Sequence, residues 1–174
     1  DANLAQYVTE PYAQAVTYLS KKNEPSVILF GATSIGRDLA PRLSARLKTG
    51  LTADCTKLEM NEDGQLFMTR PAFGGNLFAT IICPDHRPQM STVRPGVMAK
   101  PERVAGKKGE LVELDVKLAE GDVRMKVLEI VKGLEELVSL TDAKVIVSGG
   151  NGLGNPEGFD LLKKLADRLG GVVG

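Results

Sequence analysis

The sequence predicts an α/β protein, and two strand–turn–helix segments carry that prediction. Residues 26–30 form a continuous apolar run, and small residues at 31–34 separate it from a segment whose apolar side chains recur every four residues over 35–47. Residues 144–148 form a second apolar run, which a glycine-rich turn at 149–154 connects to another helical pattern. Continuous apolar runs are typical of strands buried on both faces of a parallel sheet. We therefore expect two βα units of such a sheet.

A helix is expected before the first of these strands. Thr9 is its expected N-cap, Pro11 is tolerated in the first turn, and Pro25 ends the helix after two lysines. Its apolar face consists of Tyr12, Ala15, Val16 and Leu19. In the second helical segment, Pro41 removes a backbone donor, so we expect a kink or a break near Ala40.

The middle of the chain changes to short extended segments. They cover residues 51–58, 66–70, 77–83 and 90–94. Residues 61–64, with the sequence Asn-Glu-Asp-Gly, have the chemistry of a hairpin turn. The clean alternation over 111–116 predicts a half-exposed strand. Residues 123–131 fit a strand or a helix, and their Val and Ile content favours a strand.

The C-terminal part is expected to form a separate unit. Residues 134–142 resemble a linker or a short helix, and we expect a domain boundary near Leu140. In the last helix, Asn155 is the expected cap, Pro156 suits the first turn, and Gly170 suits the position just after the helix.

Composition excludes several classes of function. The 22 basic and 22 acidic residues give a formal net charge of zero, so neither nucleic acid nor an anionic membrane is an expected partner. No apolar run approaches the roughly 18 residues that span a bilayer. Two distant cysteines, Cys55 and Cys83, favour a reduced cytoplasmic setting, and the one histidine, His86, lies among loop residues and makes a transition-metal site improbable. The first residue is Asp1, so we expect the chain to be trimmed at its front.

The glycine-rich turn is a candidate anion site. Ser148, Gly149, Gly150, Asn151 and Gly152 follow an apolar run and precede a helix, the arrangement in which backbone N–H groups receive a phosphate. The glycine spacing matches neither the dinucleotide fingerprint nor a P-loop. On spacing alone, a phosphate cradle and an ordinary tight turn remain equally open.

The turn at 31–36 has the same position in the first βα unit. It is either a second nucleotide-contact loop or a turn with a good N-cap, and capping by Thr33 and Ser34 is the favoured interpretation.

Three arginines stand directly before prolines: Arg70, Arg87 and Arg94. The residue before proline is held in extended backbone, which fixes where its side chain points. For any single pair, a surface arginine beside a turn is the favoured interpretation. For the three together, we favour arginines that are directed at an anionic or electron-rich group.

Five ordered motifs run through the chain. They are residues 28–42 (Ile-Leu-Phe-Gly-Ala-Thr-Ser-Ile-Gly-Arg-Asp-Leu-Ala-Pro-Arg), 50–55 (Gly-Leu-Thr-Ala-Asp-Cys), 69–76 (Thr-Arg-Pro-Ala-Phe-Gly-Gly-Asn), 92–96 (Thr-Val-Arg-Pro-Gly) and 147–153 (Val-Ser-Gly-Gly-Asn-Gly-Leu). Together they closely resemble the alpha subunit of electron transfer flavoprotein, including its FixB-like relatives. The resemblance covers nearly all of the chain from about Asn23 onward.

The resemblance implies a fold and a domain arrangement. Residues 1–140 would be part of an N-terminal three-layer α/β/α domain, with a parallel sheet plus extra antiparallel strands. Residues 141–174 would be the first βα unit of a Rossmann-like FAD-binding domain. The opening of the first domain and most of the second are expected to lie outside this sequence.

The resemblance also implies an electron carrier rather than an enzyme. Its cofactor would be FAD and its partner a beta subunit, in a cytoplasmic heterodimer that passes electrons between dehydrogenases, from NADH to an acyl-CoA dehydrogenase or a quinone-linked partner. Membrane insertion is not expected.

The resemblance further assigns the candidate site residues. Residues 148–152 would face FAD, although the family usually has arginine where Asn151 stands, and asparagine keeps a donor but no fixed charge. The Phe-Gly-Gly-Asn form of residues 73–76 looks like the bacterial branch that bifurcates electrons through a second FAD in the beta subunit. In that case Arg70 and Arg94 would face the second flavin.

Two other functions stay open. A nucleotide-using enzyme would bind AMP or ATP at 31–36, with Asp38 or Asp54 as its only evident general bases. A structural module would use the arginine–proline loops as a subunit interface, with no direct cofactor contact.

Overall fold

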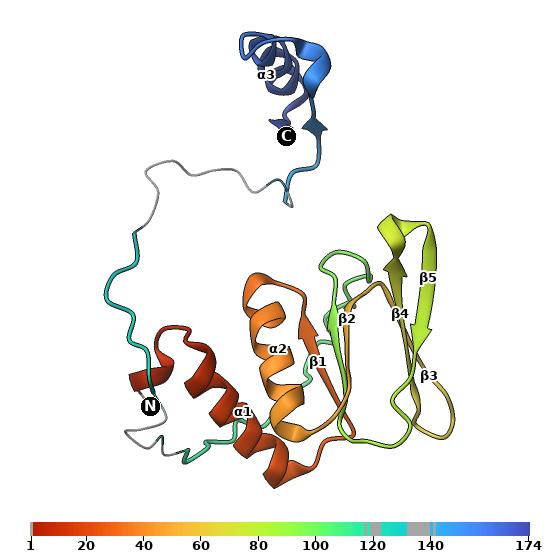
Figure 1. Ribbon diagram of the computed structural model, residues 1–174, viewed down its shortest axis with the longest axis vertical. Helices are drawn as coiled ribbons and strands as arrows, with labels where there is room; N and C mark the ends of the chain where they lie inside the picture. The colour runs from red at the N-terminus through yellow and green to blue at the C-terminus, as the bar shows by residue number, and fades with distance from the viewer. Residues whose placement is uncertain (1, 117, 119–122, 132–139, 141) are drawn as a thin grey trace. The chain divides into compact units, whose positions relative to one another are not determined.

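A computed structural model describes residues 2–116, 118, 123–131, 140 and 142–174. The chain divides into two compact units, Asp1–Leu128 and Glu129–Gly174, and each is described by itself (Figure 1). The predicted α/β class, with a parallel sheet and additional antiparallel strands, is confirmed. In the described part of the chain, no helix is both long enough and apolar enough to cross a bilayer.

The first unit contains two helices and two three-stranded sheets. Its elements are η1 (Ala2–Leu4), α1 (Thr9–Asn23), β1 (Val27–Gly31), α2 (Ser34–Leu47), β2 (Leu51–Cys55), β3 (Lys57–Met60), β4 (Leu66–Ala72), η2 (Phe73–Gly75), β5 (Leu77–Ile81) and β6 (Gln89–Val93). The parallel sheet has the order β1-β6-β2, and the antiparallel sheet has the order β3-β4-β5.

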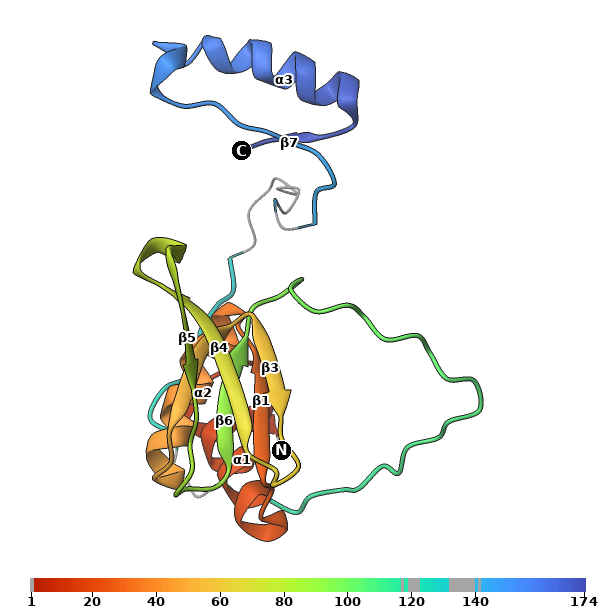
Figure 2. The same ribbon diagram turned by 90° about the vertical axis from the view of Figure 1, so that its right-hand side faces the viewer.

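These elements form layers. Helix α2 packs against all three parallel strands, and α1 packs against α2. Strand β4 contacts β2 and so brings the antiparallel sheet onto the parallel one. Figures 1 and 2 show the resulting order of helices, parallel sheet and antiparallel sheet within this unit.

The central strand of the parallel sheet is β6. Its residues Gln89, Met90, Ser91 and Thr92 are all buried, because β1 and β2 flank it and the other layers cover it. The prediction that residues 26–30 are buried on both faces is wrong. Strand β1 lies at the edge of the described sheet, and Leu29 is 51% exposed.

A small core lies between the two sheets. Cys55, Leu66 and Met68 are buried in it, and Val27 and Leu58 pack against them. The side chain of Gln89 connects the layers through hydrogen bonds. Its Oε1 accepts from the Leu66 N–H at 2.8 Å, and its Nε2 donates to the Gly64 carbonyl at 2.9 Å. A buried polar group of this kind is stable only because its hydrogen bonds are satisfied.

Helix α1 begins at Thr9, one residue earlier than a cap at Thr9 would place it. The N-cap is Val8, which makes no side-chain cap bond, so the prediction of Thr9 as the cap is wrong. The Thr9 hydroxyl instead donates to Asp38 Oδ2 in α2 at 2.5 Å, and the Tyr7 hydroxyl donates to the same oxygen at 2.6 Å. These two bonds lower the pKa of Asp38 and fasten the start of α1 to α2.

Helix α2 runs without interruption through Pro41, so the expected break near Ala40 does not occur. Its N-cap is Thr33, whose Oγ1 accepts from the Gly36 N–H at 3.2 Å. Gly36 lies close to the end of β1, where a Cβ would stand 1.9 Å from the carbonyl oxygen of Gly31. The turn at 31–36 therefore has a structural explanation in capping and close backbone packing.

The antiparallel sheet has two hairpins, and the first turns at the predicted position. In the predicted turn at 61–64, Asn61 Oδ1 accepts from the Gln65 N–H at 2.8 Å, and Gly64 has a φ of 75°. The β4–β5 hairpin turns at Phe73, which has a φ of 48° and is 81% exposed. This tip projects past the carboxyl ends of the parallel strands (Figures 1 and 2).

The strands predicted over 111–116 and 123–131 do not form, which corrects both predictions. Alternating side chains make a strand only where a neighbouring strand supplies hydrogen bonds. Val112 and Leu114 instead line an apolar groove with α1 and β1. Arg124 forms an ion pair with Glu10 in the first turn of α1, and the guanidinium lowers the pKa of that carboxyl.

The second unit is a small βαβ element. It contains β7 (Ile146–Val147), η4 (Asn151–Leu153), α3 (Gly158–Leu169) and β8 (Val172–Val173). Strands β7 and β8 pair in parallel. The prediction of a buried strand here is wrong, since Ile146 is 48% exposed. The linker or short helix predicted over 134–142 falls mostly outside the described residues.

The ends of α3 follow the sequence signals in part. Gly170 adopts the left-handed conformation just after the helix, with a φ of 63°, as predicted. The helix begins at Gly158 rather than at Pro156. The N-cap is Glu157, which makes no side-chain cap bond, so the prediction of Asn155 as the cap is wrong. Asn155 Oδ1 accepts from the Gly158 N–H at 3.1 Å and so closes the turn before the helix.

We expect Gly36→Ala to destabilise the first unit by about 3 kcal/mol, because the new Cβ would overlap a backbone oxygen that cannot move freely. Gly50→Ala is the matched control, since its Cβ would meet only Cys83 Sγ at 3.5 Å. Urea unfolding of both variants measures the difference. Equal midpoints for the two variants would contradict this close packing.

Candidate functional sites

The carboxyl ends of the three parallel strands meet at one edge of the first unit. Two backbone bonds hold these ends together: the Ala32 N–H donates to the Val93 carbonyl at 2.7 Å, and the Arg94 N–H donates to the Cys55 carbonyl at 2.9 Å. In open α/β sheets, ligands bind at this edge. It is therefore the natural place for a site in this unit.

Asp54 lies at this edge and binds two arginines. Its Oδ1 accepts from Arg94 Nε at 3.1 Å, and its Oδ2 accepts from Arg94 Nη2 at 2.6 Å. Oδ1 also accepts from Arg37 Nη2 at 3.3 Å. Arg37 comes from the first turn of α2, and its Nε donates to the Ala32 carbonyl at 3.0 Å. Asp54, near the end of β2, thus joins Arg37, which follows β1, to Arg94, which follows β6.

Arg70 also acts on Asp54 through its charge, but its contacts differ from those of Arg94 and Arg37. It lies in β4, and its positive charge contributes to the lowered pKa of Asp54. Its Nε is buried and has no hydrogen-bond partner among the described residues. A buried donor without an acceptor costs about 1–3 kcal/mol, so this atom calls for an acceptor from outside the described residues. We refer to Arg37, Arg70, Arg94 and Asp54 as the arginine cluster.

Electrostatics within the arginine cluster favour ionised groups. Hydrogen bonding to Arg94 is the largest cause of the lowered pKa of Asp54, and the charges of Arg94, Arg37 and Arg70 add to it. The same contact raises the pKa of Arg94. Burial raises the pKa of the neighbouring Cys55 thiol, which keeps it protonated and unsuited to nucleophilic chemistry. Three guanidinium groups around one carboxylate leave the cluster positively charged.

Arg87 does not join the other two arginines that precede proline. It lies before the start of β6, whereas Arg94 follows the end of the same strand. Its Nη1 donates to carbonyl oxygens of its own loop, those of Cys83, Pro84 and His86. Its role is to hold this loop. His86 itself is exposed.

The glycine-rich turn of the second unit brings together Ser148, Gly149, Gly150, Asn151 and Gly152. The turn closes on itself through a bond from the Leu153 N–H to the Gly150 carbonyl at 3.0 Å and another from the Gly154 N–H to the Asn151 carbonyl at 3.2 Å. In the part of the chain that the structure describes, no hydrogen bond uses the N–H groups of Gly150, Asn151 or Gly152. These amides stay available to an anion, shortly before the start of α3.

The glycines of this turn have two different roles. A Cβ at Gly149 would lie 2.3 Å from Leu162 Cδ1 and 2.4 Å from Leu153 Cδ1, so Gly149 allows the turn to pack on α3. A Cβ at Gly150 or Gly152 would meet nothing within 4 Å. The space beside these two glycines is thus open, which leaves room for a phosphate group next to this part of the turn.

Two residues of the arginine cluster were not predicted for this site: Arg37 was not singled out, and Asp54 was named only as a possible general base of a nucleotide-using enzyme. Arg37 and Asp54 lie within motifs 28–42 and 50–55, but nothing in either motif shows that they meet. The signal available in the sequence was their position. Arg37 closely follows β1 and Asp54 lies near the end of β2, and parallel strands bring their carboxyl ends to the same edge of the sheet.

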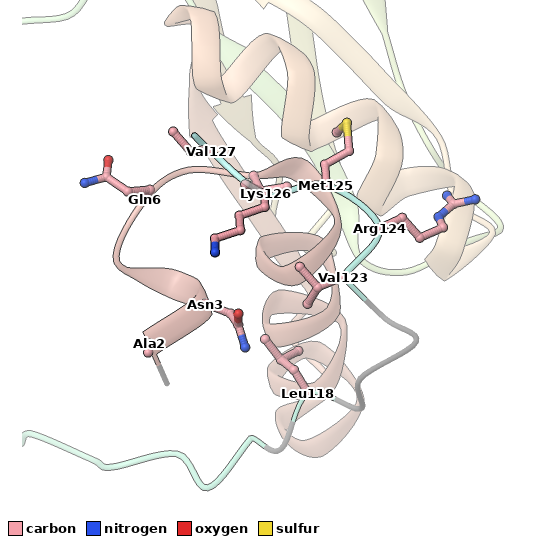
Figure 3. Close-up of a pocket in the computed structure, with 10 residues that line it drawn as sticks. Ala2, Asn3, Gln6, Leu118, Val123, Arg124, Met125, Lys126 and Val127 are labelled. Atoms are coloured by element: carbon pink, nitrogen blue, oxygen red, sulfur yellow. The ribbon is translucent and has the colours of Figure 1, made fainter. Parts of the chain in front are cut away.

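A separate cavity of about 490 Å³ lies beside the N-terminal segment (Figure 3). Ala2, Asn3 and Gln6 form one side, and Leu118 with residues 123–127 forms another. None of the predicted site residues lines it. Arg124 at its margin is already paired with Glu10, so this cavity is explained by the way residues 123–127 cross the start of α1.

Comparisons with known proteins place both units. The family described as "Electron transfer flavoprotein domain" matches residues 1–119, and the one described as "Electron transfer flavoprotein FAD-binding domain" matches residues 139–174. FAD is therefore the cofactor of the family that this sequence matches.

Curated relatives agree with these matches. The chain is 57% identical over 171 residues to the electron transfer flavoprotein subunit alpha of Thermoanaerobacterium thermosaccharolyticum, covering 98% of this chain and 52% of the relative. It is 51% identical over 172 residues to Protein FixB of Clostridium saccharobutylicum, with 98% and 51% covered. It is 45% identical over 196 residues to the acryloyl-CoA reductase electron transfer subunit beta of Anaerotignum propionicum, with 97% and 53% covered. The chain spans about half the length of these relatives.

The lowered pKa of Asp54 predicts a pH dependence of stability. A carboxyl whose pKa is lower in the folded state stabilises the fold above about pH 4, its ordinary pKa, and this contribution is lost as the pH falls through the folded value. We expect Asp54→Asn to lower the thermal midpoint at pH 7 and to differ less from the wild type near pH 3. A difference that stays constant with pH would contradict the charged contact with Arg94.

Proposed function

This chain belongs to the electron transfer flavoprotein family, and we propose that it works with a beta subunit as a heterodimer that carries electrons on FAD. We assign residues 1–140 to the N-terminal domain and 141–174 to the start of the FAD-binding domain. Support comes from the two family matches at 1–119 and 139–174 and from the division of the structure near residue 128. In this proposal the chain is a carrier subunit and not an enzyme.

In the second unit, the glycine-rich turn would hold a phosphate of FAD. When bound, FAD supplies the redox chemistry, and the protein supplies binding, orientation and electrostatics. The N–H groups of Gly150, Asn151 and Gly152 are the proposed donors. Gly149 supports them indirectly by allowing the turn to pack on α3, and the Ser148 hydroxyl is a further donor next to the turn. Asn151 adds a neutral amide, so the charge that an arginine would bring is absent at this position.

In the first unit, the arginine cluster would face a flavin held by the beta subunit. The single observation that carries this proposal is Arg70 Nε, a buried donor within a positively charged cluster that finds no acceptor in the described part of the chain. Arg70 and Arg94 would stabilise the negative charge that a flavin gains on reduction, which raises its potential. Such a second flavin is the basis for proposing electron bifurcation from NADH.

The redox partners are proposed by chemistry and by one relative. The similar protein of Anaerotignum propionicum is named as an electron transfer subunit of an acryloyl-CoA reductase. We accordingly propose an acyl-CoA dehydrogenase or a quinone-linked protein as partner, in the cytoplasm, with neither nucleic acid nor a membrane as a binding surface.

Substitutions in the glycine-rich turn separate ligand contact from packing. In the assembled flavoprotein, we expect Gly150→Ala to weaken FAD binding about tenfold, because its methyl group would occupy the space in front of the amides without disturbing the fold. Gly149→Ala should lower the stability of this unit by about 1–2 kcal/mol through its overlap with Leu153 and Leu162. Flavin fluorescence titration and thermal unfolding measure the two effects. Normal FAD affinity in Gly150→Ala would show that these amides do not face the cofactor.

Substitutions in the arginine cluster test the second flavin. We expect Arg70→Ala and Arg94→Ala each to lower the potential of one flavin in the intact heterodimer, because each removes positive charge and at least one donor. Arg87→Ala is the matched control, since Arg87 binds its own loop at the opposite end of β6. If both flavin potentials stay unchanged in Arg70→Ala and Arg94→Ala, the cluster is better explained as a structural subunit interface without cofactor contact.

A further inference from the structure

Asp54 has a backbone conformation that suits a dedicated role. Strand β2 carries one extra residue between Thr52 and Cys55 relative to β6. Within this bulge, Asp54 has a φ of 60°, in the left-handed region, where Asp and Asn are among the few side chains found regularly. The Asp54 N–H donates to Thr92 Oγ1 at 2.8 Å, which fixes this conformation against the buried central strand.

The carboxylate of Asp54 leaves Arg94 little freedom. Two parallel bonds to Nε and Nη2 hold its guanidinium in a forked pair, whose geometry restricts both distance and plane. Arg37 is held by Asp54 and by the Ala32 carbonyl together. Arg70, in contrast, keeps a buried Nε without an acceptor among the described residues.

We propose that Asp54 is a positioning residue, which orients Arg94 and Arg37 so that together with Arg70 they form a binding site for one anionic group. This inference deepens the proposed function, because the flavin of the beta subunit would supply that group in the assembled protein. The charge balance supports it: with three guanidinium groups and one carboxylate, the cluster keeps two positive charges to offer a ligand.

Neutralising Asp54 distinguishes a site that depends on the orientation of its arginines from one that depends on charge alone. Asp54→Asn would raise the charge of the cluster, so a site that depended on charge alone would bind an anion more tightly. A site that depends on orientation would bind it more weakly, because an amide accepts through only one oxygen and cannot hold the forked pair. Asparagine also tolerates the left-handed backbone, so the substitution changes little else.

The deciding experiment uses sulfate as the probe on the full-length alpha chain without flavin. Titration is followed by the Nε–Hε NMR signals of the arginines. We expect a saturable shift of the Arg70 signal in the wild type and about fivefold weaker sulfate binding in Asp54→Asn. Asp85→Asn, in the exposed loop before β6, should bind sulfate as the wild type does. Absence of a saturable response in the wild type, or equal or tighter binding in Asp54→Asn, overturns the proposal.

Folding of the variants is checked by the backbone amide spectrum of each protein. If Asp54→Asn does not fold, Arg94→Lys replaces it. Lysine keeps the charge but cannot form the forked pair with Asp54, and the same weakening is expected. Wild-type sulfate affinity in Arg94→Lys would overturn the proposal.

Flavin potentials of the assembled heterodimer then identify the ligand. A potential that falls in Asp54→Asn shows that the anionic group is the flavin. If sulfate binding weakens as expected while the potentials do not change, the positioning role stands, and only the assignment of the flavin as ligand fails.

Discussion

The buried side-chain amide of Gln89 is the contact on which the first unit depends. It stands at the start of the central strand, and its two polar atoms bind the backbone at Gly64 and Leu66. Among the described residues, the parallel and the antiparallel sheet share no hydrogen-bond ladder, so an amide between them helps to fix how one lies on the other. The small core of Cys55, Leu66 and Met68 can then pack in one arrangement. This contact thereby contributes to the position of β4, the strand that carries Arg70.

Local signals in the sequence predicted local structure well. Apolar spacing predicted the first helix and the short strands of the middle segment. Turn chemistry predicted the turn at 61–64, and the preference for glycine just after a helix predicted the left-handed Gly170. Errors arose where the outcome depends on a distant neighbour. Residues 26–30 have the composition of a central strand but lie at an edge, and 111–116 alternate like a strand but have no strand beside them.

The candidate sites divide in the same way. Glycines at 149–152 stand out in the sequence because they are consecutive, yet the sequence could not show that Gly149 serves packing while Gly150 and Gly152 border open space. Arg70 and Arg94 were chosen for the prolines that follow them. Asp54, which lies 40 residues from Arg94, could be linked to it only through the pairing of β2 with β6.

The extra residue in β2 determines which side chain goes where. The bulge lets Cys55 enter the core while Asp54 stays at the carboxyl edge of the parallel sheet. Deletion of a single residue here would restore the regular register of β2 against β6 and remove the left-handed position from which Asp54 binds Arg94 and Arg37. Chain length is thus constrained at this point, in contrast to turns such as 61–64.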